Sequence, residues 1–220
     1  MPTRLETMKW IMDCGMAAVI RAKSSEHLMQ VADAIKEGGV DVIEVTMTTP
    51  DALAVIEEVA NKYGDQVLIG VGSVLDAETC RMAILSGAEF VVGPCLDRDM
   101  IEMAHRYDKP VLPGAFTPTE IKQAWDWGAD MVKVFPASVG GPKYFKAILG
   151  PLPQIRLVPT GGVNIDTTPE FLKAGAVALC AGSALVDKQA VAEGRFDVVT
   201  DTARKFRETI DHTREEMAAG

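Results

Sequence analysis

The sequence has few of the residues from which disulfides and metal sites are built. Among its 220 residues there are 4 cysteines and 3 histidines. The cysteines lie far apart, at Cys14, Cys80, Cys95 and Cys180, and form no CxxC pair. No two histidines have the spacing of metal ligands. We therefore expect no disulfides and no resident metal or other cofactor, and a reducing cytoplasm is the simplest location.

Positive charge and long apolar runs are also scarce. Lys and Arg total 22 against 31 Asp and Glu, so the formal net charge is −9. This balance disfavours nonspecific binding to nucleic acid or anionic lipid, and an anionic substrate would need a local cationic pocket. No apolar run is long enough to cross a bilayer, and residues 1–16 carry charges where a signal peptide would be apolar. We expect no nucleic-acid partner and no membrane partner.

What the sequence does contain is a regular series of short apolar runs, about one every twenty to twenty-five residues. Most are apolar almost continuously, which is typical of parallel strands buried on both faces. Alternating runs would have favoured a β-sandwich instead. The runs predict eight strands, at residues 17–21, 42–47, 67–71, 90–93, 111–113, 131–135, 155–159 and 177–181.

Helical patterns separate the strands, and glycines follow the helices. Ser24, Asp76, Asp97 and Thr117 are suited to cap the helix that follows each of them, and Glu120 would complete a capping box with Thr117. Apolar residues at three- and four-residue spacing predict helices that include residues 26–37, 51–63, 78–86, 99–107 and 120–127.

Repetition of helix, glycine and strand without a linker predicts an α/β fold. The expected architecture is a (β/α)8 TIM barrel that forms one domain over residues 1–220. The alternative, a doubly wound open sheet, usually has fewer strands. An N-terminal helix before residue 17 and a helix over 195–216 are expected to cover the bottom of the barrel or its last gap.

Two ionisable residues stand in the middle of predicted strands, Glu44 in VIEVT and Lys133 in MVKVFP. Because side chains alternate along a strand, both should face the barrel interior if their apolar neighbours face the helices. The second and sixth strands of an eight-stranded barrel lie across the lumen from each other, so the two side chains can meet directly or through water.

Burial of both charges must serve either stability or catalysis, because each alone is costly in an apolar interior. A lysine desolvated among apolar residues loses its proton more readily, and its free amine can attack a carbonyl to form a Schiff base. A carboxylate nearby can then move protons. The structural alternative is an ion pair that only plugs the barrel.

The loops after the last two predicted strands have the composition of a phosphate site. Gly161 and Gly162 follow one strand, and Gly182 and Ser183 follow the next. In many barrels these loops bind phosphate through backbone N–H groups, although Gly-Gly can also simply turn the chain. Arg21 closes the first strand, where its guanidinium can reach a phosphate or a carboxylate, or form a surface ion pair.

Taken in chain order, several motifs resemble those of a known family. They are Ile43-Glu44-Val45-Thr46, Gly72-Ser73-Val74, Val132-Lys133-Val134-Phe135-Pro136-Ala137, Pro159-Thr160-Gly161-Gly162-Val163 and Gly182-Ser183. The set resembles bacterial 2-keto-3-deoxy-6-phosphogluconate aldolase, also called 4-hydroxy-2-oxoglutarate aldolase, over residues 17–186. That family consists of homotrimeric class I aldolases with a (β/α)8 fold.

The resemblance implies that Lys133 forms the Schiff base and that Glu44 shuttles protons while a phosphorylated keto sugar acid is cleaved to pyruvate and glyceraldehyde 3-phosphate. It implies a phosphate cradle at Gly161, Gly162, Gly182 and Ser183. The residues expected around the remainder of the substrate are Arg21, Thr48, Ser73, Phe135 and Thr160.

Two departures from the family leave the substrate open. Many members have Arg where this chain has Thr48, and Thr where it has Ser73. The second change keeps a hydroxyl, whereas the first removes a cation that Arg21 is placed to replace. The alternatives are the related aldolase of the galactonate series and a catalytically silent phosphate-binding barrel.

Overall fold

The computed structural model describes residues 2–21 and 25–219. Within them, short strands run parallel to their neighbours and are buried at every position, which explains their almost continuous apolar sequence. The strands are β1 (Met16–Ile20), β2 (Val42–Thr46), β3 (Leu68–Gly72), β4 (Phe90–Val92), β5 (Val111–Leu112), β6 (Gly114–Ala115), β7 (Val132–Val134), β8 (Leu157–Pro159) and β9 (Leu179–Ala181).

These strands form two parallel sheets, in the orders β5-β4-β3-β2-β1-β9 and β6-β7-β8. The strand predicted at 111–113 forms β5, which ends before Pro113, a residue with no N–H for a ladder hydrogen bond. Strand β5 pairs with β4, whereas β6, which lies just beyond the predicted bounds, pairs with β7, so the two short strands on either side of Pro113 belong to different sheets. At the other edges, a bridge between Thr160 and Cys180 joins the ends of β8 and β9. The fold is α/β, with a curved parallel sheet.

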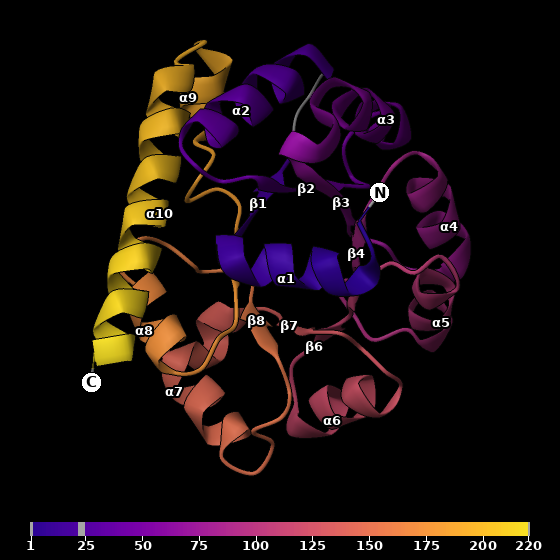
Figure 1. Ribbon diagram of the computed structural model, residues 1–220, viewed down its shortest axis with the longest axis vertical. Helices are drawn as coiled ribbons and strands as arrows, with labels where there is room; N and C mark the ends of the chain where they lie inside the picture. The colour runs from indigo at the N-terminus through magenta and orange to yellow at the C-terminus, as the bar shows by residue number, and fades with distance from the viewer. Residues whose placement is uncertain (1, 22–24, 220) are drawn as a thin grey trace.

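Helices surround the strands on the outside (Figure 1). The predicted caps at Asp76, Asp97 and Thr117 are confirmed, as is the capping box of Thr117 with Glu120, whereas Ser24 lies outside the described residues. The helices are α1 (Arg4–Cys14), α2 (Ser25–Glu37), α3 (Ala52–Tyr63), the 3-10 helix η1 (Gly64–Gln66), α4 (Ala77–Leu85), α5 (Arg98–Arg106), α6 (Pro118–Asp126), α7 (Ala137–Leu149), α8 (Thr168–Lys173), α9 (Lys188–Ala192) and α10 (Phe196–Ala219).

The two terminal helices occupy the places expected for them. Helix α1 lies across the end of the sheet where the strands begin, and α10 runs along one side, next to α2 and α8 (Figure 1). A Cβ at Gly38, after α2, would come within 2.5 Å of Ala203 Cβ, so glycine permits the close approach of α10. No helix in the described ranges has the length and apolar character needed to cross a membrane.

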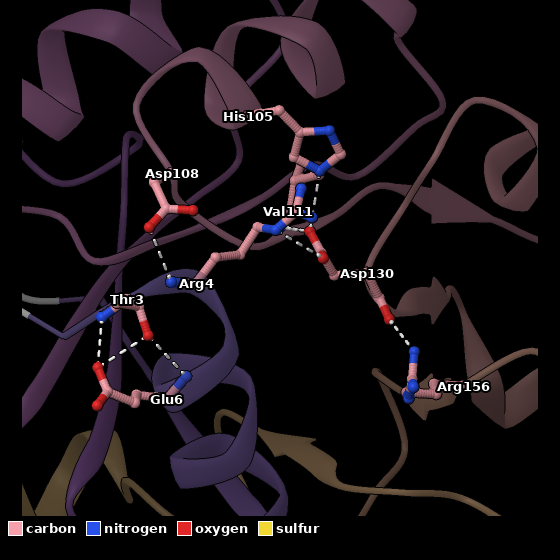
Figure 2. A network of polar contacts seen from close by, with 8 residues as sticks. All are labelled: Thr3, Arg4, Glu6, His105, Asp108, Val111, Asp130 and Arg156. Carbon is pink, nitrogen blue, oxygen red and sulfur yellow. Dashed lines mark hydrogen bonds and ion pairs between the residues drawn. The ribbon is translucent and has the colours of Figure 1, made fainter.

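A polar network holds α1 against the sheet (Figure 2). Asp130, which is 7% exposed and lies two residues before β7, accepts a hydrogen bond from the Val111 N–H at 3.0 Å and contacts His105 Nε2 at 3.1 Å. Its other oxygen lies 3.5 Å from Arg4 Nε. These contacts satisfy a buried carboxylate and close the end of the sheet at which the strands begin. The opposite end of the strands is the one that remains open to a ligand.

Candidate active site

Glu44 and Lys133 are the acidic and basic residues that the described strands contain. Their side chains are 1% and 6% exposed, which confirms the expected burial. On β2, Glu44 stands opposite Val19 and Gly70 in the adjacent strands, and on β7, Lys133 stands opposite Gly114 and Val158. The apolar neighbours in sequence pack outward, so both ionisable groups point inward.

The two groups face a common interior. Burial raises the pKa of the Glu44 carboxyl, although the charges of Lys133 and Arg21 lower it in part. On β9, burial and the Glu44 charge raise the pKa of the Cys180 thiol to about 12, against the effect of Lys133. Side chains from β2, β7 and β9 thus act on one another electrostatically, which places them around one space.

The carboxylate and the amine do not form a direct ion pair. Across the described residues, no ion pair or hydrogen bond joins Glu44 to Lys133, and Glu44 Oε2 is buried without a hydrogen-bond partner from the protein. The direct contact that the sequence allowed is therefore not formed. Leaving a buried carboxylate oxygen unpaired costs free energy, which argues against a purely structural plug and for a group that acts on a ligand.

Phe135 connects the lysine to the loop that follows β8. Lys133 Nζ lies 5.3 Å from the centre of the Phe135 ring, within the range of a cation–π contact. The ring is 41% exposed, so it lies at the open end of the interior. A Cβ on Gly161 would come within 3.3 Å of the same ring. The aromatic side chain thus forms a wall shared by Lys133 and the Gly161-Gly162 loop.

The two predicted phosphate loops lie side by side, because Thr160, next to Gly161, forms a bridge with Cys180, two residues before Gly182. Gly161 and Gly162 have φ values of 84° and 81°, a left-handed conformation that favours glycine. After β9, the Gly182 carbonyl accepts hydrogen bonds from the N–H groups of Leu185 and Val186, forming a helical turn. Ser183 is exposed within that turn.

Hydroxyl groups and one cation complete this end of the sheet. Thr48 is exposed, and its hydroxyl lies 2.9 Å from that of buried Thr46. Ser73 follows β3 with a left-handed φ of 61°. Thr160 is 8% exposed, and its hydroxyl is buried without a hydrogen-bond partner from the protein. Arg21 is exposed at the end of β1, and its charge acts on Glu44.

Sequence reasoning assigned no role to Gly72 or Cys180, although both border this interior. The carboxylate of Glu44 lies against Gly72. The charges of Glu44 and Lys133 both change the pKa of the Cys180 thiol. The signal for Gly72 was a glycine at the end of a buried strand, which often marks the close approach of another group. Cys180 gave no such signal, because an apolar strand also accommodates cysteine as a packing residue.

A parallel α/β fold whose interior holds a buried lysine and a buried carboxylate is suited to the chemistry of the aldolases that form a Schiff base with a carbonyl substrate. A family model described as KDPG and KHG aldolase matches residues 9–202. The KHG/KDPG aldolase of Escherichia coli strain K12 is 34% identical over 188 residues, which cover 85% of this chain and 88% of the relative. The chain belongs to the KDPG and KHG aldolase family.

Solved structures agree with this assignment. The KDPG aldolase of Legionella pneumophila, with pyruvate captured as a covalent carbinolamine intermediate, is 28% identical with a TM-score of 0.84, covering 90% of this chain and 96% of that one. A structure described as native KDPGal is also 28% identical with a TM-score of 0.84, covering 91% of this chain and 96% of that one.

Proposed function

We propose that this protein is a class I aldolase that cleaves 2-keto-3-deoxy-6-phosphogluconate into pyruvate and glyceraldehyde 3-phosphate. The observation that carries the proposal is the buried, unpaired Glu44 carboxylate in the same interior as the buried Lys133 amine. A structural ion pair, which the silent phosphate-binding barrel would require, is not formed between these two described residues. The family also supports activity on 4-hydroxy-2-oxoglutarate, which would give pyruvate and glyoxylate.

The reaction begins at Lys133. Its uncharged amine attacks the C2 ketone, and the resulting carbinolamine loses its hydroxyl as water when Glu44 donates a proton. Glu44 then accepts the proton of the C4 hydroxyl while the C3–C4 bond breaks. The bonding electrons move to the iminium, which leaves an enamine of pyruvate and releases glyceraldehyde 3-phosphate. Protonation at C3 and attack of water on the iminium release pyruvate and restore the amine.

Burial supports the role of Glu44 in these transfers. A carboxyl group whose pKa is raised by desolvation holds and releases protons closer to neutral pH than an exposed one does. Its oxygen Oε2 has no competing partner in the protein, so it is available to the substrate or to a bridging water. The same carboxyl can therefore act as acid in one step and as base in the next.

The remaining residues are proposed to hold the substrate. Backbone N–H groups around Gly161, Gly162 and Gly182, with the Ser183 hydroxyl, bind the phosphate. Arg21 binds an anionic group of the substrate, and Phe135 packs beside the imine. The hydroxyl groups that contact the sugar acid belong to Thr48, Ser73 and Thr160.

We propose that the two sheets act as one closed (β/α)8 barrel and one domain. The chain passes from one sheet to the other at Pro113, and the bridge between Thr160 and Cys180 joins the sheets at their other edges, which supports closure.

A homotrimer is proposed as well, with a subunit contact at the exposed apolar side chains of Met82 and Leu85 on α4. The four free cysteines suit the reducing cytoplasm that we propose as its location.

A second candidate substrate is the galactonate epimer of the same sugar acid. The similarity to the KDPGal structure favours it. The test is release of pyruvate, coupled to lactate dehydrogenase, from the gluconate epimer, the galactonate epimer and 4-hydroxy-2-oxoglutarate. Our proposal requires the highest kcat/KM on the gluconate epimer, and a preference for the galactonate epimer would overturn that choice. Cleavage of none of the three, by folded protein, would overturn the proposed activity.

A further inference from the structure

Strand β3 has two glycines on the side that faces the interior, Gly70 and Gly72. A Cβ at Gly70 would lie 2.3 Å from an atom of the Phe90 ring. A Cβ at Gly72 would lie 1.8 Å from Oε1 of Glu44, 2.5 Å from its Cδ and 2.8 Å from its Cγ. Atoms that are not bonded do not approach so closely, so neighbouring side chains occupy the space that side chains on β3 would otherwise fill.

Gly72 is not required by its own backbone conformation. Its φ lies outside the left-handed region, whereas the next residue, Ser73, has a φ of 61° and is not glycine. A glycine within a buried strand also costs stability relative to alanine. What remains to explain this residue is the room that it leaves for Glu44.

The backbone at this point is held in place. Gly72 pairs with Thr46 in the ladder between β2 and β3, and its carbonyl accepts a hydrogen bond from the Met47 N–H at 2.8 Å. The wall against the Glu44 carboxylate is therefore rigid. Since Oε2 has no partner in the protein, steric contact with β3 is what limits the orientation of this carboxylate.

We propose that Gly72 is a positioning residue, whose bare backbone holds the Glu44 carboxylate in the orientation from which it exchanges protons with the substrate. The inference rests on the proposed function for its consequence in catalysis, but its geometric part can be tested without activity. Gly72→Ala must turn the whole Glu44 side chain away, because three of its atoms would lie within 3.0 Å of the added methyl group.

The kinetic test compares Gly72→Ala in wild type and in the Glu44→Ala variant. In wild type we expect kcat to fall by about 100-fold or more, the scale of a lost acid–base group, while KM changes by less than about threefold. In the Glu44→Ala background we expect a change of less than about twofold. An unchanged kcat in wild type, or an equal loss in both backgrounds, would overturn the proposal.

Thermal unfolding supplies the test that does not depend on activity. Gly72→Ala should lower Tm in wild type and should not lower it in the Glu44→Ala background, where the clash is absent. If Gly72→Ala is insoluble, the double variant should still fold, and insolubility of both would contradict the geometry. Gly150→Ala is the matched control, because its Cβ would be 3.5 Å from the nearest atom and Gly150 lies outside the site. It should leave kcat unchanged.

Discussion

Glu44 is the residue whose environment departs furthest from that of an ordinary surface carboxylate. It is fully buried, it has no hydrogen-bond partner for Oε2, and two cations compensate only part of its desolvation. A charge held in this way lowers the stability of the folded protein. Such a residue is expected where its chemistry is needed.

The raised pKa of Glu44 predicts a pH-dependent gain in stability for Glu44→Gln. Above about pH 4.5, the ordinary pKa of this carboxyl, the unfolded chain releases the proton while the folded chain keeps it. The unfolded state then binds fewer protons, so the wild type loses stability as pH rises through this window. Glutamine cannot titrate. Urea unfolding should therefore show the smallest advantage of Glu44→Gln below about pH 4.5 and a larger advantage above it, and an equal difference on both sides of this pH would contradict the assignment.

Arg21 is the residue on which recognition of the substrate anion is proposed to depend. Arg21→Gln should raise KM for the phosphorylated sugar acid by roughly 10- to 100-fold, the effect of a lost charge-assisted hydrogen bond. The control is Arg195→Gln, which removes an exposed arginine that pairs with Glu193 outside the site. Steady-state kinetics of both variants checks this. Equal KM values for the two variants would contradict a role of Arg21 in binding the substrate anion.

At the scale of elements, the strands were predictable because their apolar runs are continuous and the turns between them contain glycine. Where the prediction failed, a local group was decisive. Pro113 cannot donate to a ladder, so the strand predicted at 111–113 ends at Leu112, and a separate strand, β6, begins at Gly114. The burial of Glu44 and Lys133 followed from alternation along the strands. The absence of a direct contact between them did not, because it depends on where the two side chains end in the interior. The role of Gly72 required knowing where another side chain lies.

The loop after β8 carries a prediction of its own. In Gly162→Ala the added Cβ would lie 2.5 Å from Ser138 Cβ at a left-handed φ of 81°, so the loop must shift. KM for the phosphorylated substrate should rise by about tenfold or more, while imine formation with pyruvate, which lacks phosphate, stays unchanged. Gly194→Ala is the control, since it has a similar φ of 72° and no atom within 4 Å. A similar KM for both variants would remove the loop from the phosphate site.

At the scale of the whole molecule, the two ends of the sheet differ in kind. The end where the strands begin is closed by α1 and by the network around Asp130, whose polar groups satisfy one another. The opposite end gathers hydroxyls, glycine loops, Arg21 and an exposed aromatic ring. The proposed site thus lies at the end of the strands opposite to the Asp130 network, the arrangement that is usual for parallel α/β enzymes.

The proposed subunit contact on α4 can be tested with one substitution. Leu85, which is 63% exposed, should lose a favourable apolar contact when it is changed to lysine, so Leu85→Lys should shift a trimer toward monomer. Light scattering after size-exclusion chromatography measures the mass of each species. Leu5→Lys, at a residue 73% exposed on α1, is the control and should not change the mass. A trimer that survives Leu85→Lys would place the contact elsewhere.

Lys133 is the residue proposed to form a covalent imine with the substrate ketone. Incubation with pyruvate and borohydride reduces such an imine to a stable amine on the lysine that formed it. Peptide mass spectrometry then locates the modified lysine. Wild type should carry one pyruvate-derived adduct on Lys133, and folded Lys133→Ala should carry none. An absence of adduct in wild type, or an adduct that persists in Lys133→Ala, would contradict imine formation at Lys133.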